Sequence, residues 1–392
     1  MLVRTGSSLL TALISTGLAL GLGCKAKPVS EDSDTSAAET HASTETATAT
    51  ETATATATAT ETGADAGTES GAETETETGT ETGTETEGGC SSESPAALME
   101  CVERPRYEQD LGFVADLRVP GSTHWQAVQD LCADRLGALG YEVELADYGT
   151  GVNVVGVKPG SSMPDERVIV GAHYDHIPGC TGADDNATGV AAVLEIARVL
   201  ADVPTPRTLV LTCWDEEEYG LVGSKAQAQA ALDAGEVLTA VFSFDMVGYA
   251  DATPGVQEVP VGFEFAFPEV YKKLEDTGFR GDFLFWVSDD TMGPLAAELE
   301  GFAATVGLPT VGVSLEDAIK SSDVAADLRR SDHASFWDRD IPAMLLNDTS
   351  NFRYASYHCS DGNDDSLDRL DNAFSVKVIQ AMAATVAVAL GL

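Results

Sequence analysis

Short apolar runs alternate with polar, glycine-containing stretches from about residue 90 to the last residue. Six of these runs have the length and apolar content of β-strands: residues 141–145, 152–157, 167–170, 209–214, 241–244 and 341–346. Helical patterns occur at residues 124–139, ending at Gly140, and at 187–200 and 370–390. Because strands and helices alternate, we expect an α/β fold with a mixed, largely parallel central sheet and helices on both faces.

The first 89 residues follow a different pattern. Residues 1–24 combine Arg4, an apolar run too short for a comfortable membrane span, and small residues leading to Cys24, which is typical of a secretory signal. Cys24 resembles the lipobox cysteine of bacterial lipoproteins, and an incidental cysteine is the alternative. Residues 25–89 are mostly Thr, Glu, Ala, Gly and Ser, so we expect a disordered tether. We therefore expect an extracytoplasmic protein, either lipid-anchored to the cell envelope or secreted.

The charge of the chain limits its partners. The tether carries 15 acidic and 2 basic residues, so of the net charge of −42 about −30 remains on residues 90–392. A domain this acidic is a poor ligand for nucleic acid and for anionic lipid surfaces. Membrane attachment is therefore expected only through a lipid anchor at Cys24. Residues 90–392 are long enough for one large domain with a substantial core.

Polar residues with metal-binding chemistry follow the ends of the predicted strands. His173 comes after the strand at 167–170, Glu217 and Glu218 after the strand at 209–214, and Asp245 after the strand at 241–244. In open α/β sheets the chemistry lies beyond the carboxyl ends of the strands. An ionised carboxylate beside an apolar run is costly unless it is paired or bound to a metal. The pattern therefore indicates a metal site.

These residues stand in segments that resemble the zinc-dependent M28 peptidases, a co-catalytic metallopeptidase family rich in aminopeptidases. The segments share their order with that family and are His-Tyr-Asp-His (173–176), Gly-Ala-Asp-Asp-Asn-Ala-Thr-Gly (182–189), Glu-Glu-Tyr-Gly-Leu-Val-Gly-Ser (217–224), Asp-Met-Val-Gly (245–248), Ser-Asp-His (331–333) and Tyr-His (357–358). Residues 359–364 depart from the family pattern. Residues 249–330 contain no matching segment, and we expect this variable region to select the substrate.

The resemblance implies two zinc ions per chain in a zinc-exopeptidase fold. Asp185 would bridge the two metals, His173 and Asp245 would complete one site, and Glu218 and His358 would complete the other. Three protein ligands per zinc leave room for a shared water, as a catalytic site requires. Other divalent ions remain open, because such ligands bind several of them.

Two further residues are expected to take part in the chemistry. By the same resemblance, Glu217 would be the general base that accepts the water's proton and passes it to the leaving amine. Asp175 would orient His173 through the second ring nitrogen. We expect His176 and His333 to be supporting or structural residues. Asp332 is either a hydrogen-bonding partner near the metals or a loop residue.

The chain has seven cysteines, which in an exported protein implies disulfides. We expect Cys180 to pair with Cys359, because both lie on loops with suspected ligands. A second bond between Cys101 and Cys132 would link two N-terminal helical segments. Cys213 lies inside a predicted strand and is expected to be a reduced core residue.

The leading functional hypothesis is an aminopeptidase that removes N-terminal residues from peptides, with small or apolar residues favoured by family tendency. A glutaminyl-cyclase-like acyltransferase is the first alternative; it works with one zinc and does not need His173 as a second-metal ligand. A catalytically retired surface binding module is the second alternative. Carboxypeptidase-like and dipeptidase specificities and the oligomeric state remain open.

Overall fold

The computed structural model describes residues 90, 92 and 94–392. The expected signal sequence, the expected lipobox cysteine Cys24 and the expected tether lie outside the described residues.

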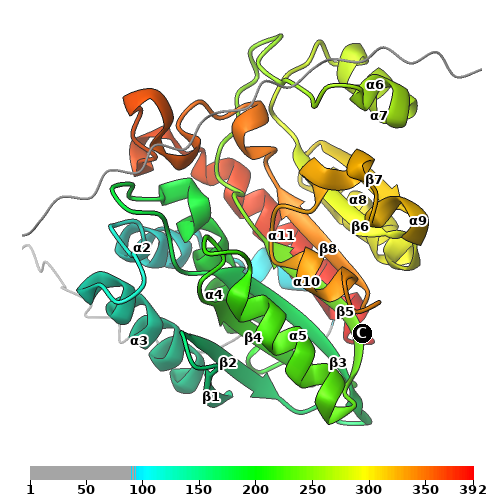
Figure 1. Ribbon diagram of the computed structural model, residues 1–392. Helices are drawn as coiled ribbons and strands as arrows, with labels where there is room; N and C mark the ends of the chain where they lie inside the picture. The colour runs from blue at the N-terminus through cyan, green and yellow to red at the C-terminus, as the bar shows by residue number, and fades with distance from the viewer. Residues whose placement is uncertain (1–89, 91, 93) are drawn as a thin grey trace, which may run out of the picture. The chain divides into compact units, whose positions relative to one another are not determined.

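One eight-stranded sheet runs through the described domain in the order β1-β2-β4-β3-β5-β8-β6-β7 (Figure 1). Its strands are β1 (Glu142–Asp147), β2 (Val152–Lys158), β3 (Met163–His173), β4 (Arg207–Trp214), β5 (Val237–Phe244), β6 (Leu284–Asp289), β7 (Thr310–Leu315) and β8 (Ala343–Asn347). The central strands β4, β3, β5 and β8 are parallel to one another. The strands β1 and β2 pair in antiparallel fashion, and β6 is antiparallel to β8 but parallel to β7. The predicted mixed, largely parallel sheet is confirmed.

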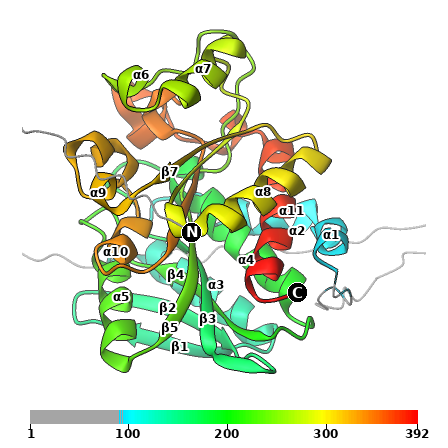
Figure 2. The ribbon, with the colours of Figure 1, turned by 90° about the vertical axis from the view of Figure 1, so that its right-hand side faces the viewer.

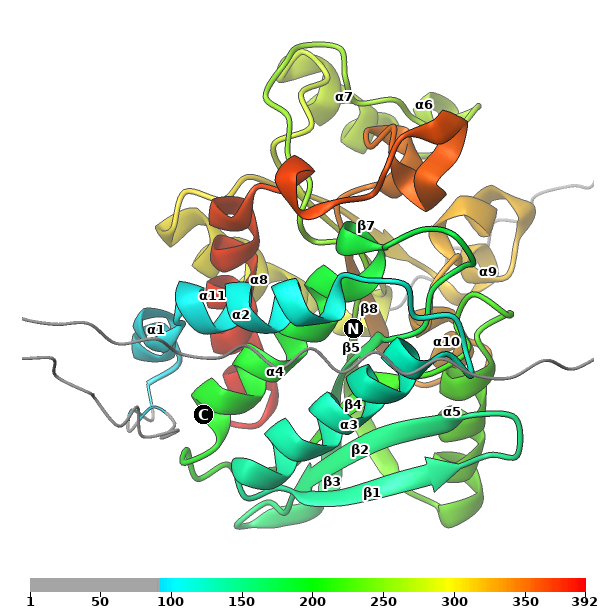
Figure 3. The ribbon, with the colours of Figure 1, turned by 90° about the vertical axis from the view of Figure 1, so that its left-hand side faces the viewer.

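Helices cover both faces of this sheet (Figures 2 and 3). One face packs against α3 (Thr123–Ala138), α4 (Gly189–Leu200), α8 (Gly293–Thr305) and α11 (Asn372–Ala389), with α1 (Pro95–Leu98) and α2 (Arg104–Val114) outside them. The other face packs against α5 (Val222–Ala234) and α10 (His333–Trp337), and α9 (Asp317–Lys320) lies close to α10 in Figure 2. The short helices α6 (Phe263–Ala266) and α7 (Pro268–Asp276) lie at the top of all three views. The predicted helices on both faces are confirmed.

The helix α11 is long and apolar enough to cross a membrane by length and composition. Most of its residues are buried inside the domain, and it packs against α8, α4 and α1. A buried core helix has the same composition, and most of the buried apolar residues of α11 belong to the hydrophobic core.

The strands β6 and β7 were not expected from the sequence. Both lie in the segment 249–330, where no motif resembles the family. All six residues of β6 are buried although the last two are Ser288 and Asp289. Asp289 is accommodated because its carboxylate accepts hydrogen bonds from the backbone amides of Thr291 and Ala343. These two strands extend the sheet beyond β8.

Three disulfides are present in the described domain. The expected bond between Cys180 and Cys359 is confirmed. The expected bond between Cys101 and Cys132 is wrong, because Cys101 pairs with Cys90 and Cys132 pairs with Cys213. The prediction of a reduced Cys213 failed because α3 lies over the face of β4 that carries Cys213, with the two Cα atoms 6.7 Å apart.

Candidate metal centre

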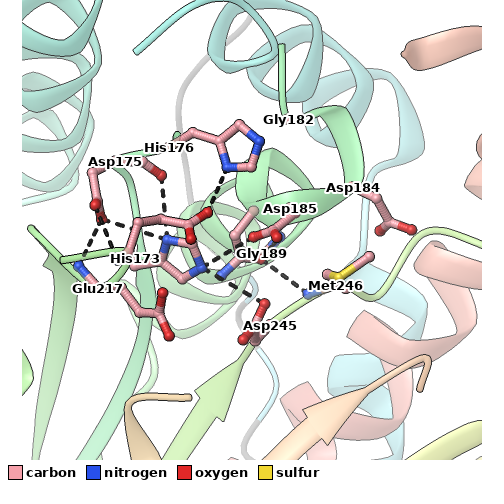
Figure 4. A network of polar contacts seen from close by, with 12 residues as sticks. His173, Asp175, His176, Gly182, Asp184, Asp185, Gly189, Glu217, Asp245 and Met246 are labelled. Atoms are coloured by element: carbon pink, nitrogen blue, oxygen red, sulfur yellow. Dashed lines mark hydrogen bonds and ion pairs between the residues drawn. The ribbon is translucent and has the colours of Figure 1, made fainter. Parts of the chain in front are cut away.

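The predicted ligands converge where the central strands end. His173 is the last residue of β3, and Glu217 and Glu218 lie on the loop after β4. Asp245 directly follows β5, and Asp185 lies in the turn that leads into α4. Figure 4 shows His173 pointing towards Asp185 and Asp245, with Asp175 beside Glu217. Strand ends of a parallel sheet meet at one edge, and this brings residues far apart in the sequence together.

Two glycines make this arrangement possible. At Gly171, two residues before His173, a Cβ atom would lie 2.5 Å from the ring of Trp214 on the neighbouring strand β4. Gly182 has a φ of +58°, and a Cβ there would lie 2.2 Å from the carbonyl oxygen of Asp185. A side chain at either position would displace β3 or the Asp185 turn.

The ligand atoms form two groups that share Asp185. In the first group, the Nε2 atom of His173 lies 3.3 Å from Asp185 Oδ1 and 3.6 Å from Asp245 Oδ1. In the second group, the Nε2 atom of His358 lies 3.1 Å from Asp185 Oδ2 and 3.3 Å from Glu218 Oε2. The two oxygens of Asp185 therefore face two different histidines.

These separations fit ligands around a cation better than hydrogen-bonded pairs. Two ligand atoms about 2.0–2.1 Å from a tetrahedral zinc are about 3.3 Å from each other, whereas a nitrogen and an oxygen joined by a hydrogen bond are about 2.9 Å apart. His173 is buried, and its Nε2 atom has no hydrogen-bond partner among the described residues. The donor set of imidazole nitrogen and carboxylate oxygen suits zinc. The residues present therefore fit a divalent metal.

Negative charge dominates the site. Burial opposes the charge on His358, but the carboxylates of Asp185 and Glu218 outweigh it and raise the pKa of His358 to about 10. Burial also raises the pKa of Glu217 well above its usual range, and the carboxylates of Asp332 and Asp245 add to this effect while His173 opposes it. A buried surplus of carboxylates is costly without a counter-charge, which a bound cation would supply.

The family model described as peptidase family M28 matches residues 153–388. The chain belongs to peptidase family M28. The match includes every residue of the two ligand groups.

Individual relatives agree with this membership. The chain is 27% identical over 226 residues to the uncharacterized protein YfbL of Escherichia coli, covering 55% of this chain and 64% of that protein. It is 31% identical over 194 residues to the Mycobacterium tuberculosis protein named probable lipoprotein aminopeptidase LpqL, covering 44% of this chain and 35% of that protein. The chain thus spans less than two thirds of the length of these relatives. The LapA aminopeptidase of Legionella pneumophila has a similar fold, with a TM-score of 0.57, 20% identity, and 76% and 75% of the two chains covered.

In this M28 domain, Asp175 contacts both the first ligand group and the Glu217 loop. Its Oδ1 atom lies 3.5 Å from Nδ1 of His173 and accepts a hydrogen bond of 2.9 Å from the backbone amide of Glu217. Its Oδ2 atom accepts a longer bond of 3.2 Å from the amide of Glu218. Asp175 therefore ties His173 to the loop that carries the expected base and a ligand.

Sequence reasoning missed two buried residues that hold the Asp185 turn of this M28 domain. Arg118 is fully buried and donates hydrogen bonds to the carbonyl oxygens of Thr181, Gly182 and Asp185. Asp365 accepts hydrogen bonds from the backbone amides of Asp184 and Asp185. Nothing near Arg118 in the sequence signals this role. The position of Asp365 in the acidic stretch that follows His358 is a weak signal.

His176, His333 and Asp332 occupy three different environments. His176 is buried, and one of its nitrogens, an oxygen of Asp185 and an oxygen of Glu218 lie within 4.8 Å of one another, so the second group has two histidines beside it. His333 is buried against Trp337, and its Nε2 atom lies 2.9 Å from the carbonyl oxygen of Leu328. Asp332 is also fully buried, and burial raises its pKa to about 7.

An apolar pocket adjoins the metal centre of this M28 domain. Its walls and floor come from β6, β7 and β8 and from the segments around α6 and α7, and they include Phe263, Leu274, Phe283, Phe285, Val311 and Leu345. Asp245, Arg330 and Tyr357 line both this pocket and the cleft that contains Glu217, Glu218 and His358. The pocket therefore opens onto the metal centre.

Proposed function

We propose that this protein is a zinc-dependent aminopeptidase with two zinc ions per chain. The observation that carries the proposal is the position of Asp185, whose two carboxylate oxygens face His173 and His358. Each of these histidines also faces a second carboxylate, Asp245 or Glu218. His173 and Asp245 would complete one metal site, and Glu218 and His358 would complete the other. When bound, the zinc pair would polarise the scissile carbonyl and acidify the attacking water.

The proton transfer is assigned to Glu217. Its carboxylate lies in the cleft with Asp185, Glu218, Asp245 and His358, and it is not a member of either ligand group. A carboxyl group whose pKa is raised by burial holds a proton more firmly than an exposed one. Glu217 would accept the proton of the attacking water and deliver it to the amine of the departing peptide. Asp175 would keep the Glu217 loop and the His173 ring in place.

The apolar pocket supports an N-terminal residue with an apolar side chain as the substrate. Its floor belongs to the hydrophobic core, and Phe283, Phe285 and Val311 are each less than one tenth exposed. A charged side chain that reached this apolar floor would lose its hydration, whereas an apolar side chain would gain by leaving water. The free N-terminal ammonium would then lie near the cleft, whose lining has four carboxylates (Asp185, Glu217, Glu218 and Asp245) against the two guanidinium groups of Arg329 and Arg330 and so favours positive charge.

The alternatives named from the sequence are less well supported. A cyclase with one zinc does not require His173, Asp185 and Asp245 to converge as they do. A retired binding module has no need to keep the Asp185 carboxylate between two ligand groups or a buried Glu217 beside them. Both observations favour a hydrolase.

An extracytoplasmic location belongs to the same proposal. Three disulfides within the described domain are typical of proteins that fold outside the reducing cytoplasm. The likeness to a protein named as a lipoprotein aminopeptidase adds support for anchoring through Cys24. Peptides would be the partners of this enzyme.

Glu217→Gln in the full-length protein tests the mechanism. This variant keeps the size of the side chain and removes its basicity, so zinc content should stay at the wild-type level while kcat falls by about 10²- to 10⁴-fold. His358→Ala is the comparison variant and should lose zinc as well as activity. Elemental analysis and hydrolysis of aminoacyl-anilides measure both quantities. Equal turnover in wild type and Glu217→Gln would contradict the proposed mechanism.

A further inference from the structure

His176 has no role in the function described so far. It follows Asp175 in the loop after β3 and is completely buried. Its backbone amide donates a hydrogen bond of 3.2 Å to the carbonyl oxygen of Arg118, so the main chain is held at this point. Figure 4 shows the His176 ring close to the metal-ligand cluster. The contacts of this fixed, buried imidazole indicate what it does beside the metal ligands.

The ring of His176 lies against two residues of the second ligand group. Its Nδ1 atom lies 2.7 Å from Oε1 of Glu218, and its ring meets the ring of His358 edge-on at 5.8 Å between centroids. The other oxygen of Glu218, Oε2, is the one that faces His358. The two oxygens of Glu218 are thus divided between the metal position and His176.

The distances separate a supporting role from a ligand role. The ligand pairs of both groups are 3.1–3.6 Å apart, near the value of about 3.3 Å for two ligands of one zinc. The separation of 2.7 Å between His176 and Glu218 is shorter and lies at the distance of a charge-assisted hydrogen bond. Within the described residues the two atoms form an ion pair whose angle does not complete a hydrogen bond, and a small rotation of the imidazole would complete it.

We infer that His176 is a positioning residue that donates a hydrogen bond from Nδ1 to Oε1 of Glu218 and thereby fixes Oε2 for the second metal. The inference rests on the proposed two-zinc function. A carboxylate that binds a metal through one oxygen can rotate about its last bond unless the other oxygen is held. His176 would restrain Glu218 as Asp175 restrains His173, so the four-residue segment 173–176 supplies one restraint to each metal site.

The test is zinc binding by the full-length protein, measured by elemental analysis and by competition with a chromophoric chelator. His176→Phe keeps an aromatic ring and removes the hydrogen-bond donor. The affinity for one of the two zinc ions should fall by about 10- to 100-fold, while the affinity for the other should stay unchanged. His333→Phe is the matched control, because His333 is equally buried and contacts Leu328 and Trp337 instead of a ligand. Its zinc affinities should equal those of wild type.

Two polar variants test the position of the donor without an apolar replacement. His176→Asn places an amide nitrogen near the position of Nδ1, and His176→Gln places it further out, near Nε2. Asn should restore much of the second zinc affinity, and Gln should not. Equal affinities in these two variants, or wild-type affinities in His176→Phe, would overturn the inference. So would an equal loss of both zinc ions in His176→Phe. A wild-type protein that does not bind two zinc ions is a separate result, which refutes the proposed function itself.

Discussion

The substitution Val311→Phe tests whether the apolar pocket receives the N-terminal side chain of the substrate. Val311 lies on β7 opposite Phe285 of β6, is 6% exposed and lines the pocket. A phenyl ring at this position would occupy space that the substrate side chain needs. Substrates with a large apolar N-terminal residue should therefore show the largest fall in kcat/KM, and substrates with N-terminal alanine the smallest.

The size of the effect follows from the apolar surface that the pocket buries. A leucine side chain has three carbons more than alanine, and burial of each is worth about 0.8 kcal/mol. The sum of about 2.4 kcal/mol corresponds to a preference of about 60-fold in kcat/KM for leucine over alanine in wild type. In Val311→Phe this preference should fall to a few-fold at most, with hydrolysis of the alanine substrate largely kept.

The assay compares kcat/KM for leucyl and alanyl anilides in wild type, Val311→Phe and Val155→Phe. Val155 is 8% exposed and belongs to the same hydrophobic cluster, but it lies on β2, near the opposite edge of the sheet from β7. Its substitution adds a similar overpacking cost of about 1–3 kcal/mol without filling the pocket. If the leucine preference survives in Val311→Phe, or disappears equally in Val155→Phe, the pocket does not select the substrate.

Two further predictions concern stability. Burial lowers the pKa of His333 to about 4 in the folded protein, against 6.5 when the side chain is exposed. Between these pH values the unfolded chain binds a proton at His333 that the folded protein does not. The free energy of unfolding should therefore fall by about 3 kcal/mol as the pH falls from 6.5 to 4. Urea unfolding of metal-free protein at pH 7 and pH 4 should show a smaller acid loss in His333→Gln, and equal losses would show that His333 does not titrate in this way. The disulfide between Cys180 and Cys359 closes a sequence separation of 179 residues. Its removal in the double variant Cys180→Ser, Cys359→Ser should lower the free energy of unfolding by about 2–4 kcal/mol and weaken zinc binding near His358; an unchanged unfolding midpoint would contradict this.

Much of the fold was predictable from local patterns. The strands β4, β5 and β8 and the second half of β3 are short apolar runs, and burial on both faces is what such runs require. The strands β6 and β7 were not assigned, although β6 is also completely buried. The reason is that Asp289 is accommodated by backbone amides supplied by a turn and by β8, and no local pattern reveals those partners.

The disulfides show the same division between local and distant information. The pairing of Cys180 with Cys359 is predictable because both cysteines lie on loops that carry expected ligands, and ligands of one site must lie close together. Cys132 and Cys213 lie on a helix and a strand with no motif in common. Only the packing of α3 on β4 brings them together.

By itself, the sequence determined the kinds of residues at the strand ends and their order along the chain. That information predicts the five ligands, Glu217 and Asp175, because motif chemistry is carried by short segments. The tertiary structure alone decided that the oxygens of Asp185 face two histidines, that Arg118 and Asp365 hold its turn, and that β6 and β7 form the floor of a pocket beside it. Local patterns report which residues will be buried, but contacts between distant segments depend on how whole elements pack. The candidate metal centre is therefore indicated by short sequence motifs, but its geometry depends on how five distant segments pack together.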